Sequence, residues 1–185
     1  MLSTKIKEAT QSAHQQLEKK VVLKLKAVRS NADYADVLKH FYAYFNALEN
    51  AIRPYVTADV LPDYSTRRDS AYIKNDIEEL GADVNELPPV VVPQIGNVVE
   101  ALGALYVMEG SIMGGPYIVQ MLQKGGVDKG FSFFSGYGQD TGRMWATFTD
   151  VLNQAASTEA DEAVAINTAN ETFANFSDVF EFKLA

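Results

Sequence analysis

The chain has 185 residues, of which 47% are apolar and 22% charged, and it contains no cysteine. This length and composition suit one globular domain with a substantial core, and the lack of cysteine excludes disulfides, thiolate zinc sites and iron–sulfur clusters. Two histidines, His14 and His40, are too few for a multi-histidine metal cage, and a net charge of −8 argues against a nucleic-acid partner.

The N-terminal sequence MLSTKIKEAT is charged where a signal peptide would be apolar, and no apolar run is long enough to span a membrane. These features predict a cytoplasmic protein without a membrane partner. The one dense basic stretch, Lys19 to Arg29, is interrupted by valines and leucines. A solvated helix end explains this stretch better than a binding patch does.

Apolar residues recur at helical spacing along almost the whole chain, which predicts an all-α fold in a single domain over residues 1–185. The expected helices, in chain order, cover residues 3–19, 31–52, 69–80, 94–124 and 142–156, with a last one opened by Ser157 and Thr158. The fourth helix is expected to break near Gly110 and Pro116, and the segment ELPPVVVP to be an extended connection.

The first candidate site is the segment KEATQSAHQQLE, residues 7–18, on the first expected helix. On a straight helix, Lys7, His14 and Glu18 project along one strip. A metal-bound histidine commonly has its second ring nitrogen fixed by a carboxylate, which Glu18 is placed to supply. A surface pair of His and Glu has the same spacing, and the spacing alone favours that simpler interpretation.

The second candidate site is the segment GALYVMEGSIMGGP, residues 103–116, within an otherwise apolar helix. A glycine inside a helix costs about 1 kcal/mol relative to alanine, and a proline about 3 kcal/mol, so the cluster needs a compensating use. Gly110 and Gly114 are one turn apart and expose bare backbone to a flat ligand or to another helix. Close helix packing is the simpler interpretation of this segment alone.

The third candidate site is the segment FFSGYGQDTGRMWATF, residues 133–148, an aromatic turn that leads into a helix. By itself this segment indicates a packed turn rather than a catalytic one.

Together and in this order, the three segments resemble the haem oxygenase family, in its bacterial biliverdin-forming branch. The pattern KEATxxxHxxxE is similar to the proximal helix of the family, GALYVxEGSxxGG to its distal helix, and FFxGYGxxTGxMWxxF to a later turn. The resemblance extends over essentially the whole chain. It implies a haem oxygenase-like helical bundle that holds haem between the first helix and the glycine-rich helix.

On the proximal side, the resemblance implies that His14 is the axial iron ligand and that Glu18 is the partner of its imidazole. Lys7 and Tyr106 are expected to hold the haem propionates, because residues 167–180 of the last helix contain no Lys or Arg.

On the distal side, the resemblance assigns the catalytic positions to Gly110, Ser111 and Gly114. The glycines are expected to bring bare backbone against the haem and to direct O2 towards the edge of the ring. Ser111 stands where some relatives carry an acidic residue that holds a distal water molecule.

The activity implied is the opening of haem to biliverdin, Fe²⁺ and CO, in which haem is both cofactor and substrate. The reaction needs O2 and electrons from an external donor such as ferredoxin or an NAD(P)H-dependent reductase. Two alternatives remain: a haem-binding or haem-storage module without turnover, and a helical relative without haem, such as a thiaminase-like or di-iron oxidase-like protein. The chain has no Glu-x-x-His pair, which argues against a di-iron site.

Overall fold

The computed structural model describes residues 1–183, which form helices joined by turns and extended connections. The elements are α1 (Leu2–Ala9), α2 (Gln11–Ala27), α3 (Asn31–Ile52), η1 (Tyr64–Thr66), α4 (Ser70–Glu79), α5 (Val98–Lys124), η2 (Gly138–Asp140), α6 (Thr141–Ala155) and α7 (Glu159–Val179). No strand is present in residues 1–183, so the predicted all-α fold is confirmed. The segment ELPPVVVP is an extended connection, as expected.

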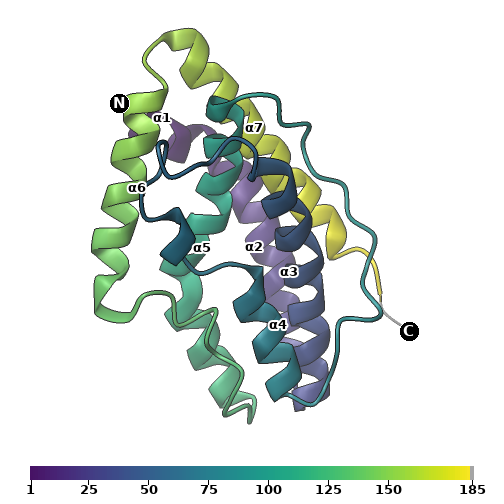
Figure 1. Cartoon of the computed structure of the whole chain (residues 1–185). Coiled ribbons are helices and arrows are strands. Elements are labelled where there is room, and N and C mark those ends of the chain that lie inside the picture. The colour runs from purple at the N-terminus through teal and green to yellow at the C-terminus, as the bar shows by residue number, and fades with distance from the viewer. Residues whose placement is uncertain (184–185) are drawn as a thin grey trace.

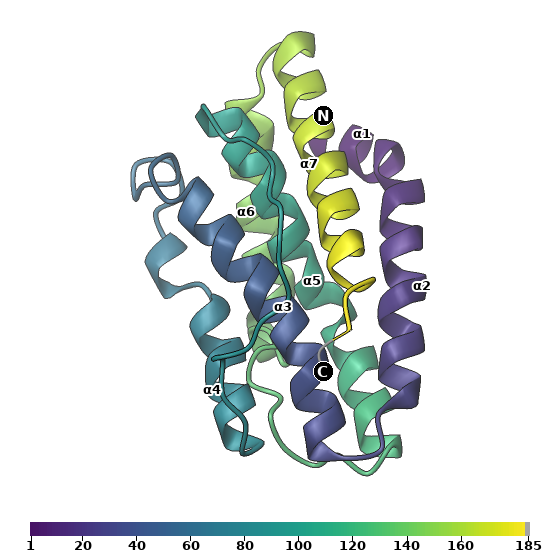
Figure 2. The ribbon, with the colours of Figure 1, turned by 90° about the vertical axis from the view of Figure 1, so that its right-hand side faces the viewer.

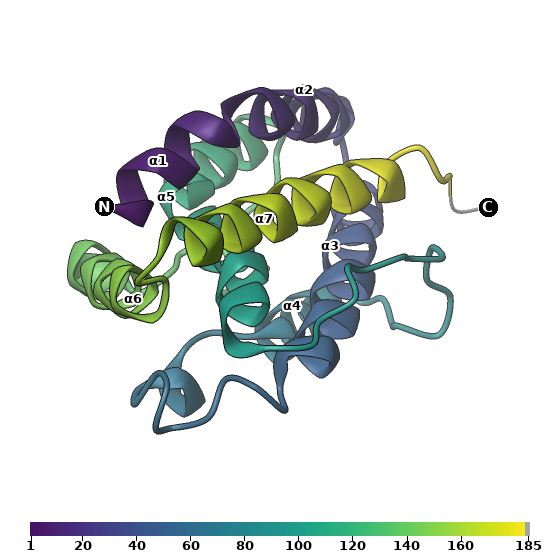
Figure 3. The same cartoon turned by 90° about the horizontal axis from the view of Figure 1, so that it is seen from above.

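Helix α5 runs through the middle of the bundle, with α6 on one side and α3 and α7 packed along it (Figures 1 and 2). Seen from above, α7 lies between the α1–α2 pair and α3 (Figure 3). The approach of α5 to α7 requires a glycine, because a Cβ at Gly103 would lie 2.5 Å from the backbone oxygen of Ala165. None of the helices in residues 1–183 is both long and apolar enough to cross a membrane.

Aromatic side chains of α3 and α7 fill the core between these helices. Tyr44 and Phe176 stack with 4.8 Å between their ring centroids, and the Tyr44 hydroxyl donates to the Thr172 carbonyl oxygen at 2.8 Å. His40 is also buried, and its ring nitrogens lie 2.6 and 2.9 Å from the carbonyl oxygens of Asp36 and Phe182. Both ring nitrogens are therefore engaged by backbone, which makes His40 a structural histidine rather than a metal ligand.

The first expected helix, residues 3–19, is divided at Thr10 into α1 and α2, and its expected end was wrong, because α2 continues to Ala27. Thr10 is buried, and both its backbone nitrogen (3.0 Å) and its hydroxyl (2.7 Å) donate to the carbonyl oxygen of Ile6. The same kind of threonine bond occurs at Thr168 and Thr172 within the uninterrupted helix α7, so this bond alone does not cause the bend. Helix α1 turns away from the axis of α2 at Thr10 (Figure 2).

Helix α5 differs from the expected broken helix, because it is helical without interruption from Val98 to Lys124, with Pro116 inside it. Its axis instead changes direction near the middle of the helix (Figure 1). Proline has no N–H to donate to the carbonyl oxygen four residues earlier. Bending the helix at this point therefore costs less free energy than bending it elsewhere, because no hydrogen bond of the helix has to be broken. The glycine-rich segment is therefore a bent but continuous helix.

Candidate functional site

His14 lies in the first turns of α2, directly after the bend at Thr10. Its backbone nitrogen donates to the Thr10 carbonyl oxygen at 2.9 Å, which starts α2. The side chain is exposed, and its ring stacks on Phe173 of α7 with 5.3 Å between centroids and 27° between planes. The bundle thus holds the imidazole plane against an aromatic ring while leaving the side chain accessible to a ligand.

Lys7 and Glu18 are both exposed, on either side of His14 in sequence. Glu18 follows His14 by one turn of α2, but no hydrogen bond joins the two side chains in the part of the chain that the structure describes. Lys7 lies in the last turn of α1, beyond the bend at Thr10. Of the three residues expected to lie along one strip, only His14 and Glu18 are on the same helix, α2. The roles of Lys7 and Glu18 stay predictions.

Tyr106 of α5 lies at the junction of α1 and α2. Its ring is half-buried and lies 5.5 Å from the ring of Trp145 on α6. Burial raises the pKa of Tyr106, and a hydrogen bond with the Thr10 side chain opposes that rise. Tyr106 therefore lies beside the bend that separates Lys7 from His14.

The glycines of α5 fall into two classes, which the sequence alone does not distinguish. A Cβ at Gly103 or Gly115 would lie 2.5 or 1.9 Å from a backbone oxygen, of Ala165 or Phe134 respectively. A Cβ at Gly114 would meet nothing within 4 Å, and one at Gly110 would meet only the Trp145 ring, at 3.7 Å. Close packing explains Gly103 and Gly115 but not Gly110 and Gly114.

A buried polar network that was not foreseen from the three sequence segments surrounds Glu109 of α5. The Glu109 carboxylate accepts from Arg67 at 2.8 Å and from the Tyr137 hydroxyl at 3.1 Å. Arg67 also donates to Asp63 at 2.8 Å and to the Met144 carbonyl oxygen at 3.0 Å. A glutamate within the apolar run ALYVME and the Arg-Arg pair were the signals that could have indicated it.

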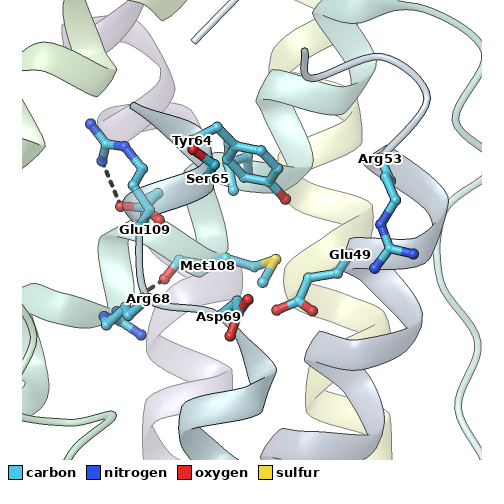
Figure 4. Close-up of a pocket in the computed structure, with 10 residues that line it drawn as sticks. Glu49, Arg53, Tyr64, Ser65, Arg68, Asp69, Met108 and Glu109 are labelled. Carbon is cyan, nitrogen blue, oxygen red and sulfur yellow. Dashed lines mark hydrogen bonds and ion pairs between the residues drawn. The ribbon is translucent and has the colours of Figure 1, made fainter. Parts of the chain in front are cut away.

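A cavity of about 120 Å³ lies beside this network (Figure 4). On α5 it is lined by Leu105, Met108 and Glu109, which at about 100° per residue lie at least about 100° around the helix from Gly110 and Gly114. Ligand pockets for small molecules are typically about 300–1,000 Å³, so this cavity suits a few water molecules instead. It is therefore not the site that the glycines and His14 would share.

A family model described as Heme oxygenase matches residues 1–182 of the chain. The chain belongs to the haem oxygenase family. Heme oxygenase PigA of Pseudomonas aeruginosa is 26% identical to this family member over 181 residues, covering 97% of this chain and 91% of that protein. A heme oxygenase of Xanthomonas campestris pv. campestris is 30% identical over 145 residues, covering 77% and 86% of the two chains.

A solved structure of the heme oxygenase from Neisseria meningitidis, in NO- and CO-bound forms, has the same fold. It matches this haem oxygenase family member with a TM-score of 0.84 at 22% identity, over 98% of this chain and 90% of that one. The haem oxygenase-like bundle predicted from the three segments is therefore confirmed.

The haem that this family implies fits the residues of this chain. A porphyrin is flat, and the bare backbone at Gly110 and Gly114 leaves the space beside it open. Trp145 and Tyr106 add an aromatic wall next to Gly110, and neutral imidazole is a usual donor to haem iron. His14 is an accessible imidazole in the proximal segment, four residues beyond the bend that Tyr106 contacts.

The two classes of glycine predict opposite effects of alanine on stability. Gly114→Ala is expected to stabilise the haem-free protein by about 1 kcal/mol, because alanine favours a helix and the new Cβ meets nothing. Gly115→Ala is expected to destabilise it, because the new Cβ overlaps the Phe134 carbonyl. Urea unfolding of the two haem-free variants measures both changes. Equal destabilisation by the two would mean that Gly114 also serves packing.

Proposed function

We propose that this chain opens haem to biliverdin, Fe²⁺ and CO, using O2 and electrons from an external donor such as ferredoxin or an NAD(P)H-dependent reductase. The proposal rests on the open space at Gly114 and the near-open space at Gly110. Both glycines lie on α5, which contacts the junction of α1 and α2 just before His14. Helix packing does not need these glycines, and a ring that must lie against bare backbone does. Membership of the haem oxygenase family supports the same activity.

His14 is proposed as the protein ligand to the haem iron. When bound, haem supplies both the iron that activates O2 and the ring that is oxidised. The Phe173 ring fixes the plane of the imidazole, so the ligand is oriented before haem arrives. Glu18, one turn later on α2, is proposed to accept a hydrogen bond from the second ring nitrogen, which holds His14 in one tautomer.

Gly110, Gly114 and Ser111 are proposed to form the distal surface. Without side chains at 110 and 114, the backbone of α5 can approach the ring and restrict the direction in which O2 lies over it. Ser111 supplies the one side-chain hydroxyl adjacent to Gly110. The Trp145 ring limits the space beside Gly110 and so helps to exclude water.

Lys7 and Tyr106 are proposed to hold the propionates of the haem. A partly exposed ion pair contributes up to about 1 kcal/mol, so Lys7→Ala is expected to weaken haem binding by no more than about tenfold. The proportions of the biliverdin isomers should change more clearly, because the propionates set the rotation of the ring. Isomer analysis of the product by chromatography measures this effect.

Lys5→Ala is the matched control for Lys7→Ala. Lys5 is exposed on the same helix and pairs with Glu162 of α7. Its replacement is expected to leave haem affinity and the isomer mixture unchanged. If Lys7→Ala also leaves both unchanged, another group holds the propionates.

A single assay tests the proposed function against its alternatives. Haemin is added to the purified protein, reductant is supplied in air, and the spectrum is followed. A haem oxygenase loses its Soret band while biliverdin appears. A storage module keeps its Soret band under the same conditions, and a relative that does not bind haem gives no Soret complex at the start.

A further inference from the structure

Asp76 of α4 is a buried carboxylate that the proposed function does not use. It is 1% exposed. It accepts hydrogen bonds from the Ser132 backbone nitrogen at 3.0 Å, the Ser132 hydroxyl at 2.6 Å and the Phe133 backbone nitrogen at 2.9 Å. Burial raises the pKa of Asp76, and these hydrogen bonds oppose that rise. A buried carboxylate is unfavourable unless donors surround it, so Asp76 and these two residues hold each other in place.

The loop held in this way, residues 130–136, follows α5 in the chain and folds back onto it. The Phe134 carbonyl oxygen occupies the place of a side chain at Gly115, because a Cβ there would lie 1.9 Å from that oxygen. Gly136 packs on Ile112 of the same helix, since a Cβ at Gly136 would lie 3.5 Å from the Ile112 Cβ. The loop therefore packs directly against the backbone of α5.

Two further anchors fix the same loop on α3 and α4. At its start, the Gly130 backbone nitrogen donates to the Glu79 carboxylate at 3.1 Å, and the Tyr34 hydroxyl donates to the Gly130 carbonyl oxygen at 2.6 Å. Further along, the Phe134 ring packs edge-on against Phe41, with 5.2 Å between centroids. The hydrogen bonds to Asp76 fasten the stretch between these anchors, which leads directly to the contact with α5.

This contact lies behind the surface that is proposed to face the haem. At about 100° per residue, Gly115 lies about 140° around α5 from Gly110 and about 100° from Gly114. We propose that Asp76 is a positioning residue, which fixes the loop as a support behind α5 and so sets how closely Gly110 and Gly114 approach the haem. The proposal rests on the proposed function. A looser loop lets α5 move back from the ring, and a side chain at 115 pushes α5 towards it.

The first test asks, in the haem-free protein, whether Asp76 supports the loop against Gly115. Gly115→Ala lowers the urea midpoint, because the new Cβ overlaps the Phe134 carbonyl. In Asp76→Asn a backbone N–H of the loop faces an amide NH2, whichever way the amide lies, so the loop can yield. In that background, Gly115→Ala is expected to cause at most about half of its shift in the wild type. An equal shift in both backgrounds overturns the proposal.

Asp83→Asn is the matched control for Asp76→Asn. Asp83 is exposed, and its carboxylate accepts from the Asn85 backbone nitrogen at 2.9 Å instead of from the loop. In this background the shift caused by Gly115→Ala should be unchanged. Circular dichroism checks that the variants fold. If Asp76→Asn does not fold, Ser132→Ala removes only the hydroxyl donor and is expected to reduce the Gly115→Ala shift in the same direction.

The second test measures haemin binding by spectral titration. Gly115→Ala is expected to weaken binding by about fivefold or more, because a fixed loop forces α5 into the space of the ring. Adding Asp76→Asn lets the loop yield instead, and is expected to recover at least about threefold of that affinity. Two changes that only destabilise the protein would not improve binding.

Either of two results of the second test overturns the proposal. One is an unchanged haemin affinity in Gly115→Ala, and the other is a double variant that binds haemin no better than Gly115→Ala does. If the wild-type protein forms no haemin complex at all, it is the proposed function that fails. The first test needs no haem, so it still decides whether Asp76 and the loop support α5.

Discussion

Replacing His14 with alanine is expected to abolish haem degradation, with biliverdin formation reduced at least about 100-fold. The variant should fold, because the His14 side chain is exposed and its one aromatic contact is the Phe173 ring. Haem added to it should lose the spectrum of an imidazole-ligated complex. Imidazole in the buffer is expected to restore that spectrum and part of the activity, because it fills the space left by the side chain.

Gln15→Ala is the matched control for His14→Ala, since Gln15 is the next residue of α2 and is also exposed. It should keep the spectrum and the activity of the wild type. His40 offers no substitute ligand, because backbone carbonyl oxygens contact both of its ring nitrogens. A His14→Ala protein with the wild-type spectrum and full biliverdin yield would show that His14 is not the ligand to the iron.

Gly110→Leu is expected to fold and to bind haem through His14, but to lose biliverdin formation by at least about tenfold. The new Cβ would contact Trp145 at an ordinary distance of 3.7 Å, so the helix tolerates it. The rest of the leucine side chain moves the backbone of α5 away from the ring and opens space for water. With O2 no longer directed to the ring edge, the variant should gain peroxidase-like oxidation of small phenols, measured alongside biliverdin.

Gly96→Leu is the control for Gly110→Leu. Gly96 is exposed just before α5, and a Cβ there would meet only the Glu100 carboxylate, at 3.5 Å. This variant should keep biliverdin formation and gain no peroxidase activity. Ring opening at the wild-type rate in Gly110→Leu, with haem normally bound, would show that Gly110 does not face the haem.

The helices could be predicted from the sequence where local interactions determine their limits. Helix α3 spans Asn31–Ile52 as expected, and the Ser30 side chain caps it by accepting from the backbone nitrogen of Asp33 at 3.1 Å. Helix α7 begins with a reciprocal capping box of Thr158 and Asp161. Such caps join residues that are three apart in sequence, so the order of the residues is enough to predict them.

The bend at Thr10 could not be predicted in the same way. Threonine occurs within straight helices, and nothing near Thr10 in sequence distinguishes it. In the folded chain, Tyr106 of α5 lies against Thr10, and the Asn170 side chain of α7 donates to the Ala9 carbonyl oxygen at 3.2 Å. Asn170 thus satisfies a backbone carbonyl at the bend from a distant part of the sequence, and Tyr106 packs against the Thr10 side chain. The bend separates Lys7 from the strip that His14 and Glu18 share.

By itself, the sequence determined the helical class, most helix limits and the segments that resemble haem oxygenases, because these depend on residue order and spacing. The tertiary structure decided which glycines of α5 face open space, since the answer depends on where Ala165 and Phe134 lie. It also decided that Arg68 donates to the Ser111 hydroxyl, because the two residues are 43 positions apart in the chain. A hydrogen bond of this kind is selected by burial and by competition for partners, which only the packed chain establishes.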